Sequence, residues 1–296
     1  MSAAPPSTSP STPPLSGLQP LGPILIGDGM LRLHHALLDL LAALSPGDWQ
    51  RPTAAAPWTV KDVVAHLLDT DIRRLSAQRD RQPAPPPAQP IESYAALVDY
   101  LNWLNAQWVA AARHISPRLL VEFLAITGPA LHALLSEIDP YAPARVAVSW
   151  AGETTSAHWF DMAREYTEKW HHQQHIREAA GAPLLDGPEW LGPVLATFLR
   201  GLPHAYRAAP AAPGTAVVVE IPGPAGGQWT IVHDGDVWQL WGGAPAQADA
   251  WLRLDADSAW RLLTKGLAPA DAMARLHVTG ERELAQPFLD MVSIMA

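Results

Sequence analysis

The sequence predicts a helical bundle followed by a smaller α+β domain. Apolar residues recur at helical spacing through most of the stretch from about residue 23 to residue 181. From about residue 215 the chain changes to short runs rich in Val, Ile and Trp, which are typical of β-strands. With 296 residues, of which 48% are hydrophobic, the chain is long enough to bury a core in each of two domains.

The composition narrows the range of partners. A net charge of -9, with 17% charged residues, provides no basic surface for nucleic acid or an anionic membrane. The chain has no cysteine, so any thiol chemistry requires a thiol from outside. It has no run of 18 apolar residues and no recognisable signal peptide, and we expect a cytoplasmic protein. The sequence leaves the oligomeric state open.

The domains are expected in a simple order. Residues 1–20 are mostly Pro, Ser, Thr and Ala, which cannot bury a core, and are predicted to be a disordered tail. The helical domain is expected over residues 21–184 and the α+β domain over residues 185–296. Helical spacing and stop signals predict helices near residues 23–44, 60–75, 93–115, 116–138 and 156–181. Because each has an apolar stripe, these helices should pack together as a bundle.

Local signals mark two points within these helices. Thr59 is expected to cap the second helix, with Asp62 three residues later in a variant of the capping box. The pair Gly128-Pro129 should kink or break the fourth helix, because proline lacks the backbone N–H that helix interiors use.

The α+β domain is predicted to hold an antiparallel sheet of three or four strands with helices. Asp234-Gly235 lies between two β-rich runs and indicates a hairpin. The domain is also rich in tryptophan, at Trp229, Trp238, Trp241, Trp251 and Trp260. These rings could line a cavity for a hydrophobic ligand, although packing against helices is their more common role.

The most informative stretch is the long helix from Ser156 to Gly181, which holds four of the twelve histidines. At about 100° per residue, side chains with metal-ligand chemistry lie on or beside one face: Asp161, Glu165, Glu168, His172 and His175. Glu168 and His172 are one turn apart, so both can bind one ion. The alternative is a solvated face on which the histidines contact only water.

A metal site in a bundle needs ligands from facing helices. His66, in the middle of the second helix and beside its apolar face, is the candidate third ligand. His175 could be a fourth ligand or act as an acid or base. We interpret His34 and His35, in the first helix, as a surface residue and an edge-of-core residue rather than as ligands, although one of them could line a pocket mouth. The sequence lacks a Ser-His-Asp arrangement, a Gly-rich phosphate loop and an HExxH motif, which excludes the corresponding hydrolase, nucleotide-binding and protease classes.

Three stretches resemble a known family. PWTVKDVVAHLLD, residues 57–69, is similar to the first metal-binding helix of the DinB/YfiT-like four-helix bundles, in which a tryptophan and a helix cap precede the first metal histidine. EKWHHQQHIREAAG, residues 168–181, resembles the second motif of the mycothiol-dependent maleylpyruvate isomerase branch. VTGERELAQPFLDMVSIMA, residues 278–296, resembles the small sterol-carrier-like domain that follows the bundle in this branch.

The resemblance implies a metal-dependent enzyme. His66, Glu168 and His172 would bind a divalent metal, zinc in most cases, with nickel and iron as alternatives. The metal would bind a low-molecular-weight thiol, such as mycothiol or bacillithiol, as thiolate. The thiolate would add to a small electrophile, giving S-transfer, or to a conjugated cis double bond, giving cis-trans isomerisation. The branch often has Asp where this chain has His175.

A carboxylate-bearing electrophile also needs a cation near the metal. Arg177 follows the candidate ligands but lies about 180° from Glu168 around the helix, which favours a structural role. Arg253, which shares a strand face with Trp251, and Arg261 on the next helix are candidates from the second domain, and we expect Arg253 to be the catalytic one. The alternative function is a non-catalytic metal- and hydrophobic-ligand-binding protein.

Overall fold

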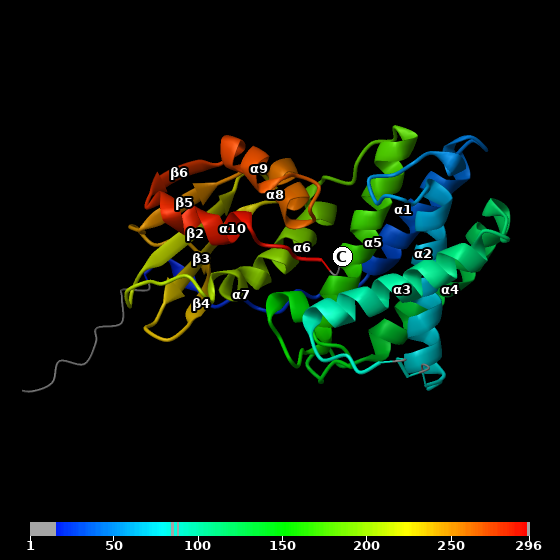
Figure 1. Cartoon of the computed structure of the whole chain (residues 1–296), viewed down its shortest axis with the longest axis horizontal. Coiled ribbons are helices and arrows are strands. Elements are labelled where there is room, and N and C mark those ends of the chain that lie inside the picture. Colours follow the sequence, from blue (N-terminus) through cyan, green and yellow to red (C-terminus); the bar gives the residue numbers. More distant parts are fainter. Residues whose placement is uncertain (1–15, 84–85, 88, 295–296) are drawn as a thin grey trace, which may run out of the picture. The chain divides into compact units, whose positions relative to one another are not determined.

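The computed structural model describes residues 16–83, 86–87 and 89–294. By its contacts the chain separates into a bundle unit and a sheet unit. The bundle unit is Pro23–Phe198 together with the chain from Ser293, and the sheet unit is the chain up to Gly22 together with Leu199–Val292. We describe each unit by itself (Figure 1). The domain limits expected at residues 20 and 184 stay a prediction.

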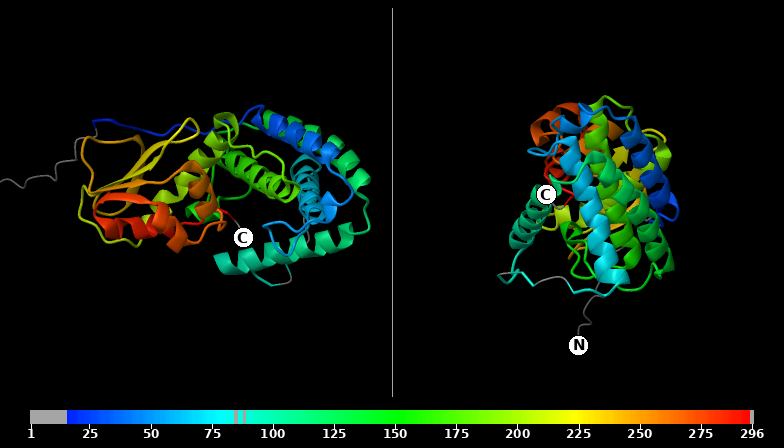
Figure 2. Two further views of the ribbon diagram at one scale, coloured as in Figure 1. Left: turned by 90° about the horizontal axis from the view of Figure 1, so that it is seen from above. Right: turned by 90° about the vertical axis from the view of Figure 1, so that its right-hand side faces the viewer.

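Among the described residues, the bundle unit has α1 (Gly29–Ala43), α2 (Val60–Arg74), α3 (Tyr94–Ala112), α4 (Pro117–Glu137), α5 (His158–Ala180) and α6 (Pro188–Phe198). Contacts join α1 to α4, α4 to α2, α2 to α5 and α5 back to α1, which closes a ring of four helices. α3 packs on α2, and α6 packs on α5. The predicted four-helix bundle is therefore confirmed, and Figure 2 shows α3 outside the ring.

α2 supplies a regular part of the bundle core. Its buried apolar residues recur every three or four positions: Val60, Val63, Val64, Leu67 and Leu68. They belong to one cluster with buried leucines of α1 and α4 and with Ile176 of α5. Burying each such side chain contributes about 1.5–3 kcal/mol before entropy is counted. His66 lies beside this stripe, so the packing of α2 fixes its position.

The predicted start of α2 is also confirmed. The Thr59 side chain accepts a hydrogen bond from the Asp62 backbone N–H at 3.3 Å. In return, the Thr59 backbone N–H donates to Asp62 Oδ2 at 3.0 Å. This complete capping box holds the first turn of α2, two turns before His66.

The break considered at Gly128-Pro129 is absent, because α4 is one helix from Pro117 to Glu137, and the kink stays a prediction. Gly128 instead provides space for a neighbour on α1. A Cβ at this position would lie 2.2–2.4 Å from three atoms of the His34 ring, which is buried between the helices. The interpretation of these two histidines is therefore wrong, because His34, expected at the surface, is buried, and His35, expected at the edge of the core, is exposed.

In the described part of the chain, α4 is also the one helix that is long and apolar enough to cross a membrane by length and composition. A single helix of this kind is weak evidence, because core helices of soluble proteins share both properties. Leu120, Leu124, Leu131 and Leu135 of α4 are buried inside the bundle unit.

The sheet unit has six described strands in the order β1-β4-β3-β2-β5-β6. Their bounds are β1 (Leu18–Gln19), β2 (Ala216–Ile221), β3 (Gly227–His233), β4 (Trp238–Gly243), β5 (Ala250–Arg253) and β6 (His277–Gly280). Its helices are α7 (Leu202–Tyr206), α8 (Ala256–Leu263), α9 (Pro269–Arg275) and α10 (Gln286–Leu289). The predicted α+β fold is confirmed. The expected antiparallel sheet of three or four strands is wrong, because the described sheet has six strands and β5 pairs with the free edge of β2 in parallel.

The hairpin expected at Asp234-Gly235 joins β3 to β4. The Asp234 backbone N–H donates to the Val237 carbonyl at 3.0 Å. Its side-chain Oδ1 accepts from the backbone N–H groups of Asp236 and Val237, both at 2.9 Å. Gly235 has a φ of +116°, a value that side chains with a Cβ rarely adopt.

The predicted disordered tail of residues 1–20 is partly wrong. Residues 1–15 lie outside the described part of the chain. Leu18 and Gln19 form β1, which pairs with Gly243 and Gly242 at the edge of β4. A strand this short is held by backbone hydrogen bonds, so the side-chain pattern gives no sign of it.

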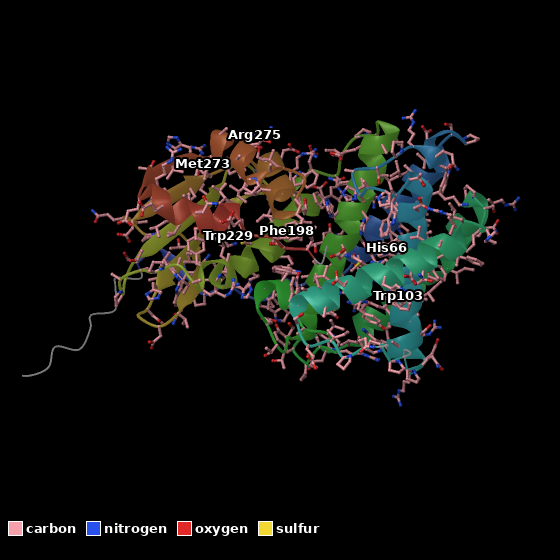
Figure 3. The ribbon with its side chains drawn as sticks, viewed as in Figure 1. His66, Trp103, Phe198, Trp229, Met273 and Arg275 are labelled. Carbon is pink, nitrogen blue, oxygen red and sulfur yellow. The ribbon has the colours of Figure 1, made fainter. Side chains whose placement is uncertain are left out.

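The tryptophans of the sheet unit mainly serve packing. Trp229, which Figure 3 labels, Trp238 and Trp260 are buried. Trp238 meets the ring of Tyr206 edge to face, with centroids 5.3 Å apart, and donates its Nε1–H to the Ala209 carbonyl at 3.4 Å. These contacts agree with the more common role considered from the sequence.

Replacing Gly128 by Ala should destabilise the bundle unit by about 1–3 kcal/mol, because the added methyl group overlaps the His34 ring. Urea unfolding measures this change. Gly47→Ala is the matched control, since the nearest atom to a Cβ there is 3.9 Å away. The double variant of Gly128→Ala and His34→Ala should lose less stability than the sum of the two single variants. Equal stability of the Gly128 and Gly47 variants would contradict the proposed packing.

Candidate functional site

Buried charges fix the register between α2 and α5. The Arg74 guanidinium at the end of α2 donates to both carboxylate oxygens of Asp161, at 2.8 and 2.9 Å, near the start of α5. Its Nε–H donates to Glu165 Oε2 at 3.0 Å. All three side chains are buried. Because the end of α2 meets the start of α5, the two helices run antiparallel.

A second layer of the same network lies one turn further along α5. Lys169 Nζ binds the carboxylate of Asp71 on α2. The other oxygen of Asp71 accepts from Thr127 of α4 at 2.9 Å. Arg164 adds contacts to Asp161 and Glu165 at 3.2 and 3.3 Å. The whole network therefore ties α2, α4 and α5 together and balances three basic groups against three acidic ones.

Glu165 and Lys169 are charged at neutral pH. Burial alone would raise the pKa of Glu165, but Arg74, Lys169 and Arg164 outweigh it and hold this pKa at about 2. Burial alone would lower the pKa of Lys169, but Asp71 and Glu165 raise it. From the sequence, Asp161 and Glu165 are expected on or beside the face of α5 that has metal-ligand residue types. Both carboxylates instead bind Arg74.

The same register brings His66 of α2 against His172 of α5. Their ring centroids are 4.8 Å apart, and the rings are nearly perpendicular, at 74°. Trp58 covers both, at 5.0 Å from His66 and 6.2 Å from His172. Figure 3 labels His66 within the bundle unit. Two imidazoles that share one tetrahedral zinc at ~2.0–2.1 Å would have centroids about 5 Å apart, so the observed spacing suits joint binding.

The remaining candidates lie along the same part of α5. Glu168 Oε2 is 3.8 Å from His172 Nε2. The His175 ring is 5.6 Å from His172 and 4.2 Å from His171. His171 was not among the predicted site residues, although its position one turn before His175 is a sequence signal for the contact. The structure thus gathers four histidines beside one carboxylate.

Both central imidazoles are neutral. Burial, aided by the charges of Arg73 and Lys169, lowers the pKa of His66 to about 4. Burial and the neighbouring histidines lower the pKa of His172 well below its ordinary value. The Nδ1 atoms of both rings are buried, and neither has a hydrogen-bond partner among the described residues. Neutral imidazoles with available lone pairs are the form that metals bind.

These donors fit a divalent metal in chemistry but do not form a complete ligand set. Two imidazoles and a carboxylate suit zinc, and they approach one another in pairs. Within the described residues, however, no group of three or more His, Asp or Glu side chains is arranged so that it could hold a metal ion. The assignment of His66, Glu168 and His172 as ligands stays a prediction.

The arginines considered from the sequence have separate surroundings. Arg177 donates to the backbone carbonyls of Pro183, at 2.9 Å, and Ala36, at 3.2 Å, which agrees with a structural role. Arg253 lies on β5 of the sheet unit, is more than half exposed, and has its Nε 3.7 Å from Glu220 Oε1. Its expected catalytic role stays a prediction.

The sequence model described as "Mycothiol maleylpyruvate isomerase N-terminal domain" matches residues 30–177, which is half of the chain. The chain belongs to this family. The matched residues include His66, Glu168, His172 and His175, so the candidate site lies wholly within the part of the chain that defines membership. The resemblance inferred from residues 57–69 and 168–181 is confirmed.

Solved structures support the fold of this family member. Two crystal structures of mycothiol-dependent maleylpyruvate isomerase, one of a mutant, match it with a TM-score of 0.51. Each match covers 88% of this chain and 97% of the other at 14% identity, so it shows the fold alone. A UbiJ-SCP2 ubiquinone synthesis protein matches 35% of this chain, and 96% of its own, at 19% identity, with a TM-score of 0.25 that carries no argument. None of the curated proteins matches the chain.

Replacing Arg74 by Ala should destabilise the bundle unit by about 3–5 kcal/mol at pH 7, because it leaves the buried carboxylates of Asp161 and Glu165 without their main counter-charge. Arg164→Ala, which removes longer contacts to the same groups, is the control and should cost less.

The loss of stability caused by Arg74→Ala should depend on pH. The folded-state pKa of Glu165, about 2, lies below its ordinary value of 4.5, so its ion pair contributes fully above pH 4.5 and is lost as the pH falls toward 2. Urea unfolding should therefore show that the difference in free energy of unfolding between wild type and Arg74→Ala becomes smaller from pH 7 to pH 3. A gap independent of pH would contradict the assignment.

Proposed function

We propose that the protein is a metal-dependent enzyme that uses a low-molecular-weight thiol, such as mycothiol or bacillithiol, to isomerise a small electrophile or to transfer the thiol to it. The observation that carries the proposal is the pair of neutral imidazoles of His66, which is buried, and His172, which is partly buried, beside Glu168 in a member of the mycothiol maleylpyruvate isomerase family. We also propose that it acts in the cytoplasm, where such thiols are kept reduced.

In this proposal, His66, Glu168 and His172 hold a divalent metal, with zinc favoured over nickel and iron. When bound, the metal supplies Lewis acidity that lowers the pKa of the thiol. The chain's own residues set the conditions for this chemistry. Low pKa values keep both imidazoles unprotonated, and the Trp58 ring lies 5.0 Å from His66 and 6.2 Å from His172. His175, buried beside His172, is proposed to accept and return the thiol proton.

The reaction balances without any further reagent. The thiolate forms a C–S bond with one carbon of a double bond conjugated to a carbonyl, and the electron pair moves to the carbonyl oxygen as an enolate. Rotation about the resulting single bond and expulsion of the thiolate give the trans isomer and regenerate the thiol. In S-transfer the enolate takes a proton, and the adduct leaves. Both outcomes use the same residues, and the family's name favours isomerisation.

The alternative, a non-catalytic metal- and hydrophobic-ligand-binding protein, has less support. It depended on tryptophans of the sheet unit that could line a cavity for a hydrophobic ligand. Trp229, Trp238 and Trp260 are instead buried in packing contacts.

Protein purified without a histidine tag should contain close to one equivalent of zinc, and His172→Ala should lose most of it while staying folded. Elemental analysis gives the metal content, and far-ultraviolet circular dichroism checks the fold. His35→Ala, at an exposed histidine of α1, is the matched control and should keep its metal. Wild-type protein with less than ~0.3 equivalent and no uptake of zinc or nickel would contradict the site.

Replacing Arg253 by Ala should lower kcat/KM for a carboxylate-bearing electrophile by at least about tenfold, because losing a charge-assisted contact costs more than ~1.5 kcal/mol. Arg282→Ala removes another exposed charge of the sheet unit and should leave the value unchanged. If the Arg253 variant stayed within ~2-fold of wild type, its catalytic role would be wrong.

A further inference from the structure

α4 has apolar residues on two opposite faces. On one face, buried leucines recur every three or four positions and pack inside the bundle unit: Leu120, Leu124, Leu131 and Leu135. The opposite face has apolar residues at the same helical spacing, but these residues are exposed: Leu119, Phe123, Ile126, Pro129 and Ala133. These five residues form the outer stripe of α4. As a result, the apolar window of 18 residues in α4 is only 28% buried within the chain.

The outer stripe keeps large apolar side chains in water. Leu119 is 37% exposed, Phe123 is 38% exposed and Ile126 is 69% exposed. Single exposed apolar residues are common in soluble proteins, whereas a continuous row of them marks a surface that another molecule covers. The candidate metal ligands lie on α2 and α5, so the outer stripe lies outside the proposed metal site.

The charges of α4 favour a protein partner over a membrane. A helix that lies on a lipid surface usually has several Lys or Arg residues along its polar face. α4 has one such residue, Arg118, which already donates to Glu122 of the same helix at 2.8 Å. The chain as a whole has a net charge of -9, which anionic lipids repel.

The outer stripe is complementary in size to itself. Its amino-terminal half has the larger residues Leu119 and Phe123, its carboxy-terminal half has the smaller residues Pro129 and Ala133, and Ile126 lies at its centre. When two copies of α4 pack antiparallel about a twofold axis at Ile126, residues equally far before and after Ile126 face each other. Leu119 then faces Ala133 of the second copy, and Phe123 faces Pro129. Each large side chain therefore meets a small one.

The same pairing is complementary in charge. Arg118 precedes the outer stripe, Glu137 follows it, and both are exposed. With a rise of ~1.5 Å per residue, an antiparallel pair places Glu137 of the second copy within about one helical turn of Arg118. Helical side chains lean toward the amino terminus, so these two side chains lean toward each other. A parallel pair would instead place like charges side by side at both ends.

We propose that the outer stripe of α4 binds a second copy of this chain, as an antiparallel helix pair around a twofold axis at Ile126. A helix of 21 residues is ~31 Å long and ~10 Å wide, so the contact is smaller than the ~800 Å² per partner of a standard interface. The dimer is therefore weak, with a dissociation constant on the order of micromolar. The proposed function does not require this dimer, so either can fail without the other.

Sedimentation equilibrium of the full chain at ~5–300 µM tests the proposal, because the apparent mass should rise toward that of two chains. Ile126→Glu should weaken the dimer by at least about tenfold, since it buries two carboxylates opposite each other at the axis. Val237→Glu, at a 57% exposed residue of the β3–β4 hairpin, is the matched control and should associate like wild type. Wild type that remains a single chain at ~300 µM would overturn the proposal.

Single cysteines test the arrangement, because the chain has no cysteine of its own. Ile126→Cys should form a disulfide-linked dimer on mild oxidation, since facing residues of packed helices have Cα atoms within the ~4.4–6.8 Å that a disulfide spans. Leu119→Cys should stay unlinked, because its two copies lie ~21 Å apart along the helices. Val237→Cys, in the sheet unit, should also stay unlinked. Equal linking of Leu119→Cys and Ile126→Cys would overturn the antiparallel pair.

Two further measurements separate the dimer from other roles of the outer stripe. At ~1 µM, where wild type is a single chain, Ile126→Glu should unfold at the same urea concentration as wild type. A midpoint lower by ~0.5 M or more would show that Ile126 supports the fold and would overturn its role in a dimer. Vesicles of phosphatidylcholine and phosphatidylglycerol should not sediment the protein. Vesicle binding that Ile126→Glu abolishes would assign the outer stripe to a membrane and overturn the proposal.

Discussion

The fork of Arg74 onto Asp161 and Glu165 is the interaction on which the candidate site depends. Removing a buried charge from its partner costs several kcal/mol, so α2 and α5 cannot slip by a turn without exposing or isolating these groups. Each step back along α2 matches a step forward along α5: Arg74 meets Glu165, Asp71 meets Lys169, and His66 meets His172. The charges therefore place the two histidines opposite each other, although the rings exchange no strong interaction of their own.

Lys169 connects the charged layer to the histidines electrostatically. Asp71 and Glu165 raise the pKa of Lys169, which keeps it positive inside the bundle. The same positive charge contributes to lowering the pKa of both His66 and His172. An ion network that only joined helices would have no effect on imidazole protonation. Here its position one turn from the rings helps to keep them neutral, the state in which an imidazole can bind a metal.

Local patterns could predict the fold class, the capping box at Thr59 and the turn at Asp234-Gly235, because each depends on residues close in sequence. They could not predict which carboxylates of α5 bind Arg74 and which lie beside His172. Carboxylates at Glu165 and Glu168 are chemically alike, and what separates them is Arg74, a residue on another helix. The role of Gly128 also depends on a residue that is distant in sequence. Beside a proline it indicates a break, whereas the ring of His34, far away in sequence, requires its missing side chain.

Arg73 and Arg74 show why adjacent residues of one type can have different roles. Successive positions on a helix point about 100° apart, so Arg74 faces the carboxylates of α5 while Arg73 lies on the His66 face. Stability accounts for Arg74, because its charge is buried and fully paired. Arg73 is 37% exposed, and its guanidinium pairs with Asp69 of its own helix and makes a long contact to Asn105 of α3. One arginine of the pair therefore fixes the register between α2 and α5, whereas its neighbour makes no contact with α5, among the described residues, that could do so.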